Sequence, residues 1–318
     1  MSPKQIRCIE NSQTGGRIAF LAPGQGIDSW ADGKILLDQS NETHRIYEKV
    51  YDATGVDIVD ICDRDEPVND SSIVQAAALG IGVARANYLK ESGVNADYLI
   101  GLSSGDFTNA VISGAMTVED GALIAYERGI YQNEEAGGKG GAVVAVHGRR
   151  ALKIQEIIRG LGGVNVLGYN SPIKTGFAYL HEDYDELVNR LRENPEVRRV
   201  LDIPNLNFPP HGPAVEKVQK RLADLFKSMR LKGSVVKDAT IPIIATKTAR
   251  AMKQARTIQH NLIWQTTNPT NLKSSVYFAV NRGVEDFYDL GPGNIMSKLL
   301  GDFSLRESVR VHPVLTQP

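Results

Sequence analysis

The stretch GLSSG at residues 101–105 carries the residue types that could do covalent chemistry. An apolar run before it predicts a short buried strand, and apolar residues at helical spacing after it predict a helix. G-x-S-x-G between a strand and a helix is typical of a nucleophile elbow, in which glycines relieve crowding and the middle serine projects from the turn. We therefore expect Ser103 to be a nucleophile. Ser104 is the alternative nucleophile, and a helix N-cap with incidental glycines is the alternative without chemistry.

Two backbone N–H groups are candidates to stabilise an oxyanion at Ser103. The first belongs to Ser104, at the start of the expected helix, where unpaired N–H groups and the helix dipole favour negative charge. The second belongs to Gln25, in the turn PGQG that follows an apolar run at residues 17–22. Ligands of α/β proteins bind at the carboxyl ends of such strands, although a plain strand–helix loop would have the same glycines.

A serine needs a base to become a nucleophile near neutral pH, and two of the six histidines are serious candidates. His312 completes the chain order Ser103, then Asp286 or Asp289, then His312, which is the order in α/β-hydrolases. His211 lies in the proline-rich loop NFPPHGP, where the chain is expected to return to its larger part. The residues alone leave these two histidines equally placed.

Arg128 is a candidate for a buried cation. It lies in a predicted helix that begins near residue 117, and its face of that helix carries the small residues Gly121 and Ala125. Small neighbours would let the guanidinium turn inward to a pocket. A surface position is the commoner outcome for an arginine, and spacing alone does not decide between the two.

The composition is that of an ordinary globular protein and excludes several classes. A length of 318 residues allows one large domain, or one that carries a smaller insertion. A net charge of −1 creates no overall field toward nucleic acid or a membrane, and neither is an expected partner. No apolar run reaches the length of a membrane span. Cys8 and Cys62 lie in unrelated contexts, so we expect no disulfide, no metal site and a cytoplasmic location.

The elements that must position these side chains predict an α/β fold. A glycine-rich joint at residues 136–141 is followed by a change of rhythm to strand, helix, two strands, helix and strand. This βαββαβ order is the ferredoxin-like arrangement. We therefore expect a loose tail at 1–16, an α/β-hydrolase-like parallel sheet in a large subdomain at 17–138 and 205–304, a ferredoxin-like small subdomain at 139–204, and a C-terminal tail at 305–318.

Together, these features resemble the malonyl-CoA:acyl carrier protein transacylases and the related acyltransferase domains of polyketide synthases. Each motif is weak alone, but their order is specific, as is the βαββαβ insertion between serine and histidine. The resemblance covers roughly residues 17–302. The landmarks are PGQG at 23–26, GLSSG at 101–105, ERG at 127–129, NSP at 170–172, PH at 210–211, NP at 268–269 and LGPG at 290–293.

The resemblance implies a role for each candidate residue. Ser103 would be acylated, and His211 would be its base in a dyad that requires no carboxylate. The N–H groups of Gln25 and Ser104 would form the oxyanion hole. Arg128 would pair with the free carboxylate of a malonyl-type acyl group, since a planar guanidinium suits bidentate pairing.

The resemblance also implies the reaction and its partners. The acyl group would move from coenzyme A to the phosphopantetheine thiol of an acyl carrier protein, in fatty acid or polyketide biosynthesis. No metal or other cofactor is needed, and a monomer is expected. The further residues expected at the substrate are Leu102, Asn170, Pro210 and Asn268.

Some positions depart from the family pattern. Leu102 stands where the family usually has histidine, and Asp106 where it usually has glutamate. Pro210 occupies a position at which the family tunes the size of the acyl group. Leu102 makes the floor of the site more apolar, so the departures leave the identity of the acyl group open.

An acidic carrier protein would need a basic face near the cleft. The candidate residues of this basic face are Lys217, Lys220, Arg221, Arg250, Lys253 and Arg256.

Three alternative functions remain open. They are a hydrolase that uses the same dyad to clear acyl groups from carrier proteins, a catalytically decayed carrier-binding subunit, and an ordinary α/β-hydrolase that uses His312.

Overall fold

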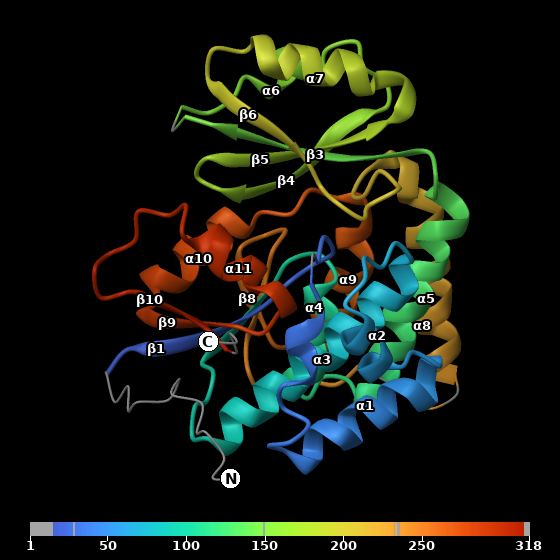
Figure 1. Ribbon diagram of the computed structural model, residues 1–318, viewed down its shortest axis with the longest axis vertical. Coiled ribbons are helices and arrows are strands. Elements are labelled where there is room, and N and C mark those ends of the chain that lie inside the picture. Colours follow the sequence, from blue (N-terminus) through green and yellow to red (C-terminus); the bar gives the residue numbers. More distant parts are fainter. Residues whose placement is uncertain (1–14, 28, 149, 232, 234–235, 315–318) are drawn as a thin grey trace.

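The computed structural model describes residues 15–27, 29–148, 150–231, 233 and 236–314. The expected N-terminal tail, apart from Gly15 and Gly16, and Cys8 lie outside the described residues. A large α/β part carries a smaller sheet on one side, with the two helices of that small part on its far face (Figure 1).

The large part is built on a six-stranded sheet in the order β10-β9-β1-β2-β7-β8. Every neighbouring pair is parallel except β7 and β8, so the expected parallel sheet is present with one antiparallel edge strand. β10 pairs with β9, which corrects the tail expected at residues 305–318. The strands are β1 Arg17–Ala22, β2 Tyr98–Gly101, β7 Ile243–Ala245, β8 Arg250–Met252, β9 Val284–Asp289 and β10 Arg310–Pro313.

Helices cover both faces of this sheet, because its central strands bury side chains on both sides. In β1, Phe20 points to the face covered by α1–α5, α8 and α9, whereas Ala19 and Leu21 point to the face covered by α10 and α11. The helices are α1 Asn41–Thr54, α2 Ile58–Arg64, α3 Ser71–Glu91, α4 Gly105–Ile112, α5 Val118–Ala136, α8 Glu216–Leu231, α9 Ala255–Trp264, α10 Leu272–Asn281 and α11 Ile295–Leu300.

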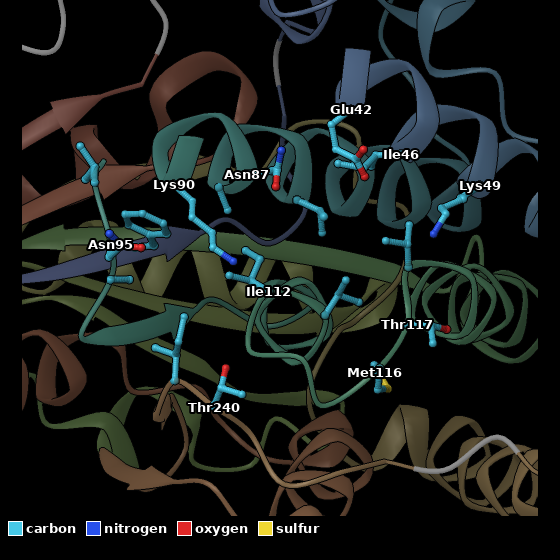
Figure 2. A pocket seen from close by; sticks show the side chains of 18 of the residues that line it. Glu42, Ile46, Lys49, Asn87, Lys90, Asn95, Ile112, Met116, Thr117 and Thr240 are labelled. Carbon is cyan, nitrogen blue, oxygen red and sulfur yellow. The ribbon is translucent and has the colours of Figure 1, made fainter. Parts of the chain in front are cut away.

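A large cavity lies at the amino-terminal end of the sheet. It has a volume of about 580 Å³ and is lined by residues of α1, α3 and α4 and by the segments that lead into β2 and β7. Figure 2 shows Lys90 of α3 and Ile112 of α4 beside it. Ser103 and His211 do not line this cavity. It is therefore separate from the chemistry predicted at the carboxyl end of β2.

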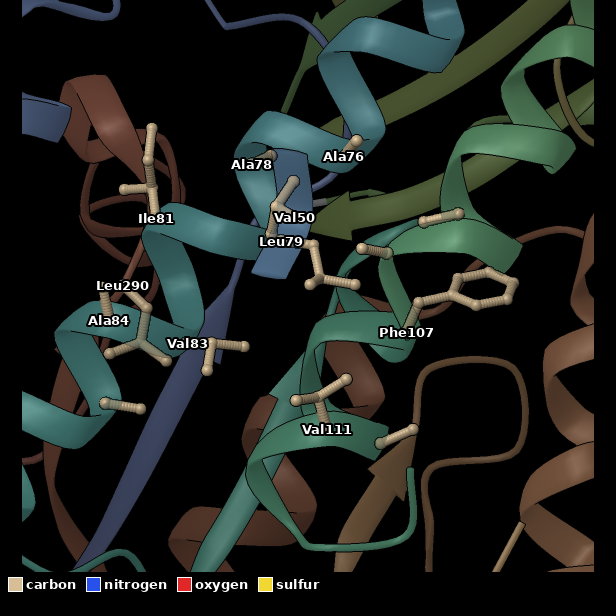
Figure 3. Packing of buried hydrophobic residues seen from close by; sticks show 14 of the residues in the cluster. Val50, Ala76, Ala78, Leu79, Ile81, Val83, Ala84, Phe107, Val111 and Leu290 are labelled. Carbon is tan, nitrogen blue, oxygen red and sulfur yellow. The ribbon is translucent and has the colours of Figure 1, made fainter. Parts of the chain in front are cut away.

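Helix α3 is buried on nearly all sides over most of its length, as the apolar run at residues 76–84 requires. Figure 3 shows Leu79 and Val83 of this helix among the same buried cluster as Phe107 and Val111 of α4. Helix α5 packs closely against α3, and a Cβ at Gly129 of α5 would overlap the backbone of Ser72 in α3. This close approach brings the two helices near enough for their buried polar side chains to meet.

The small sheet has the ferredoxin-like topology that was predicted. Its antiparallel order is β4-β5-β3-β6. The apolar core includes Phe177 from the sheet and Leu187 and Leu191 from α7. Among the described residues, no helix is long and apolar enough to cross a membrane. The elements are β3 Gly140–His147, α6 Ile154–Ile158, β4 Val164–Ser171, β5 Lys174–Leu180, α7 Tyr184–Glu193 and β6 Val197–Asp202.

Candidate active site

Ser103 sits on a sharp turn between β2 and α4, as the G-x-S-x-G pattern predicts. Its φ is 53°, in the left-handed region that residues with a side chain rarely adopt. A Cβ at Gly105 would overlap the carbonyl of Ala22, and a Cβ at Gly101 would lie 2.5 Å from the backbone nitrogen of Asp106. Both glycines are therefore required by the close passage of the backbone, and Ser103 is the residue that this turn projects.

His211 is the histidine that meets this serine. Its Nε2 lies 2.8 Å from Oγ of Ser103, and its Nδ1 lies 2.7 Å from the carbonyl oxygen of Gln265. A carbonyl oxygen can only accept, so we assign the ring proton to Nδ1 and leave Nε2 to accept from the serine hydroxyl. The third member of the arrangement is thus a backbone carbonyl and not a carboxylate.

Burial keeps the His211 imidazole neutral. The side chain is 2% exposed. Burial and then the positive charge of Arg128 lower the pKa of His211 to about 4, against a smaller opposing effect of its hydrogen bond to the Gln265 backbone. A neutral imidazole can accept the serine proton throughout the physiological pH range.

His312 lies elsewhere, and the alternative order Ser103–Asp286/Asp289–His312 is wrong. His312 is on the edge strand β10, where its Nε2 lies 2.7 Å from Oδ1 of Asp286. β9 and β1 stand between that strand and β2, which leads to Ser103. Asp289 accepts hydrogen bonds from the backbone of Gly291 and Ser297, and so stabilises the turn after β9.

A cavity of about 70 Å³ opens beside the dyad. It is lined by Ser103 and His211, by the Gly24–Gln25 turn after β1 and by residues of β4 and the linker that follows β6. A Cβ at Gly24 would lie 2.8 Å from the carbonyl oxygen of Leu102, so glycine is what allows this turn to approach the elbow. The approach places Gln25 at the same cavity as the serine.

Arg128 is turned inward and is 1% exposed. Its Nη1 donates to Oε1 of Gln75 over 2.5 Å, and its guanidinium carbon lies 5.6 Å from the centre of the Phe107 ring. Gln75 belongs to a polar network that continues through Ser71 to the side chain of Gln25. Arg128 is therefore buried, and the alternative that it lies at the protein surface is wrong.

A buried acid accompanies this arginine. Oδ2 of Asp106 accepts from Nδ2 of Asn261 over 2.8 Å. Burial raises the pKa of Asp106 to about 7, although the hydrogen bond from Asn261, the nearby Thr246 hydroxyl and the charge of Arg128 oppose the rise. Burial also lowers the pKa of Arg128 to about 10. Among the described residues, Oδ1 of Asp106 and Nε of Arg128 have no hydrogen-bond partner, so each keeps an unused hydrogen-bonding group.

Comparison with known proteins agrees with this arrangement. Residues 19–288 match the acyl transferase domain family. The chain belongs to that family. It is 26% identical over 290 residues to the malonyl CoA-acyl carrier protein transacylase of Bacillus subtilis, covering 89% of each chain.

Solved structures show the same fold. The malonyl transacylase of Streptococcus pneumoniae aligns with a TM-score of 0.82 at 26% identity, over 93% of this chain and 95% of that one. A malonyl transacylase in complex with a type II polyketide synthase acyl carrier protein aligns with a TM-score of 0.82 at 21% identity, over 93% of this chain and 94% of that one. The latter likeness shows the fold alone.

The structure brings most of the expected residues of this acyl transferase domain together. Leu102, Asn170 and Pro210 line the cavity beside the dyad. Asn268 does not line it, because its side chain turns back to the carbonyl of Trp264, 2.8 Å away. Its backbone lies near the His211 ring, and its expected role at the substrate stays a prediction.

Several residues around the candidate site were not predicted from the sequence. Gln75 could have been noticed, because it is the one polar side chain in the otherwise apolar run of residues 73–84. The role of the Gln265 carbonyl could not be predicted from the sequence, because every residue type has a backbone carbonyl. The apolar lining residues also carried no distinguishing pattern; they are Leu167, Ile203 and Leu206.

The first half of the expected basic face is largely neutralised. Arg221 pairs with Glu134 over 2.5 Å and Glu135 over 3.3 Å, and Lys217 lies 3.6 Å from Glu135.

Within the described part of the chain, no group of three or more His, Cys, Asp or Glu residues could hold a metal ion.

Proposed function

We propose that this acyltransferase moves a malonyl-type acyl group from coenzyme A to the phosphopantetheine thiol of an acyl carrier protein, by way of an acyl-enzyme at Ser103. The observation that carries the proposal is the 2.8 Å contact between Nε2 of His211 and Oγ of Ser103, with the buried Arg128 near enough for its charge to lower the pKa of the imidazole. The relatives are named as malonyl transacylases of acyl carrier proteins, which supports the choice of donor and acceptor.

In the first half-reaction, His211 takes the proton of the Ser103 hydroxyl as Oγ attacks the thioester carbonyl. The resulting oxyanion accepts hydrogen bonds from the N–H groups of Gln25 and Ser104. When the C–S bond breaks, protonated His211 donates its proton to the departing coenzyme A thiolate. The products are free coenzyme A and an ester on Ser103.

In the second half-reaction, neutral His211 takes the proton of the phosphopantetheine thiol. The thiolate attacks the ester carbonyl, and the bond to Oγ breaks as His211 returns the proton to Ser103. Arg128 holds the malonyl carboxylate through both steps by a bidentate ion pair. Because the carboxylate stays paired, the acyl group is kept in place while coenzyme A leaves and the carrier arm enters.

Intact-protein mass spectrometry after mixing with malonyl, substituted malonyl and acetyl coenzyme A tests the proposal. We expect a stable adduct of malonyl mass on the wild-type protein, no adduct on Ser103→Ala, and transfer of the adduct to an added holo acyl carrier protein. An adduct that decays to free acid without carrier would indicate the hydrolase. A wild-type protein that takes no acyl group from any donor would overturn the transferase and leave the carrier-binding subunit.

A further inference from the structure

Strand β4 of the small sheet touches the segment that carries His211. Nδ2 of Asn165 donates a hydrogen bond to the backbone carbonyl of His211. A Cβ at Gly212 would overlap the Asn165 amide, so the asparagine packs directly against the residue that follows the base. A side chain from the small sheet thus holds the backbone of a residue that acts in the large part.

The backbone of His211 needs such support. Its φ is 54°, which is unfavourable for a residue with a side chain and persists only where surrounding contacts impose it. The flanking Pro210 and Pro213 limit the loop, but neither has an N–H group with which to bond its surroundings. The Asn165 amide supplies a polar anchor at the strained residue itself.

The same strand also supports the other segment that sets the imidazole. The N–H of Tyr169 donates to the carbonyl of Thr270 over 2.9 Å, and the N–H of Thr270 donates to the carbonyl of Leu167 over 3.1 Å. A Cβ at Gly168 would overlap the Thr270 side chain. Thr270 lies five residues after Gln265, whose carbonyl accepts from Nδ1 of the base. β4 therefore braces both the backbone of His211 and the loop that orients its ring.

We propose that β4 is a positioning element for the base and that Asn165 is a positioning residue for proton transfer between His211 and Ser103. This inference rests on the proposed role of His211. Asn165 does not line the cavity beside the dyad, so it acts through the His211 backbone and not on substrate. A displacement of a reacting group by about 1 Å can cost about 10²-fold in rate, and loss of the anchor releases the strained residue toward such a displacement.

The test is the rate at which a fluorophosphonate labels Ser103, because this reaction needs the dyad but no natural acyl donor. We expect Asn165→Ala to label about 10- to 100-fold more slowly than wild type. Asn165→Asp keeps the side-chain volume but places an acceptor against the carbonyl, so it should also be slow. Asn194→Ala is the matched control, since it removes another asparagine–backbone bond, to the N–H of Glu196, in the same subdomain. It should label like wild type.

A pH profile separates positioning from a loss of folding. In the wild type, burial and the charge of Arg128 hold the pKa of His211 at about 4. If Asn165→Ala loosens the loop, water reaches the ring and the acid limb of the labelling rate moves up toward the ordinary histidine value of about 6.5. The limb of Asn194→Ala should not move.

Wild-type labelling rates and an unmoved acid limb in both Asn165 variants, with His211→Ala slow, would overturn the positioning role and leave the proposed function intact. Equal labelling in wild type and His211→Ala would overturn the role of His211, and the brace with it. If Asn165→Ala fails to fold by circular dichroism, the isosteric Asn165→Asp decides by the same two measurements.

Discussion

Nε2 of His211 lies 2.8 Å from Oγ of Ser103, and both residues have left-handed backbones, with φ of 54° and 53°. Each such conformation costs on the order of 1–3 kcal/mol for a residue with a side chain. Different contacts offset this conformational free energy at the two residues. At Ser103 they are the close packing that glycine allows, and at His211 they are the hydrogen bonds with Asn165 and Gln265. The two reacting groups are thus held by two independent supports.

The choice of base gives the first prediction. His211→Ala should lower the rate of Ser103 acylation by about 10²- to 10⁴-fold, the usual contribution of a general base. His312→Ala is the matched control, since it removes a histidine that pairs with Asp286 at the sheet edge. Acyl-enzyme formation followed by intact mass measures both. A larger loss in His312→Ala than in His211→Ala would contradict the assignment.

The elbow glycine gives the second prediction. In Gly105→Ala the new Cβ would overlap the carbonyl of Ala22, so the turn must shift and we expect destabilisation of about 1–3 kcal/mol together with loss of Ser103 labelling. Gly162→Ala is the control, because nothing lies within 4 Å of its added Cβ. Denaturant unfolding measures the free energy of unfolding of the two variants, and fluorophosphonate labelling measures the reactivity of Ser103. An unchanged labelling rate in Gly105→Ala would contradict the claim that the elbow geometry requires this glycine.

The elbow could be predicted from sequence because its requirements are local. Glycines at two positions and a strand–helix context are all contained in about a dozen residues. The same locality explains why the βαββαβ order was predictable. Short edge strands such as β8 and β10 have too few residues for an alternation of apolar and polar side chains to be recognised, so they were not predicted.

The base could not be chosen from sequence because its choice depends on strand order. His312 lies on the edge strand β10, whereas the loop that carries His211 meets the residue after the central strand β2, and these positions depend on contacts between distant segments. The partner of Nδ1 is a backbone carbonyl, which has no residue-type signal. Arg128 was ambiguous for a similar reason, since its partner Gln75 lies 53 residues away on another helix.

The pKa of the base gives the third prediction. Since the pKa of His211 is held at about 4, the imidazole is neutral above that value and acylation by acetyl coenzyme A should stay level from about pH 5 to 8. The rate should fall only on the acid side, as His211 becomes protonated. Quenched-flow acylation across this range measures it. A half-maximal rate near pH 6.5 would show that the imidazole is solvated.

Asp106 gives a fourth prediction, for malonyl donors alone. Its pKa of about 7 means that it ionises as the pH rises through neutrality and then competes for the charge of Arg128. We expect the KM for malonyl coenzyme A to rise above pH 7 in the wild type and to stay level in Asp106→Asn, whereas acylation by acetyl coenzyme A shows no such rise in either. A malonyl KM that rises equally in Asp106→Asn would contradict the coupling.

Arg128→Met tests the arginine itself. Methionine is apolar and flexible enough to fill the buried space beside Phe107, but it removes the charge that would pair with the malonyl carboxylate. Since a hydrogen-bonded charge contributes about 1.5–3 kcal/mol, malonyl acylation should fall by about 10- to 100-fold relative to acetyl acylation. The same charge lowers the pKa of His211, so its removal should move the acid limb of acetyl acylation upward. If the variant loses its preference for malonyl over acetyl donors but the acid side of its pH profile does not move, Arg128 contacts the substrate without influencing the pKa of His211. An unchanged preference would show that the arginine serves only the buried network of Gln75 and Ser71.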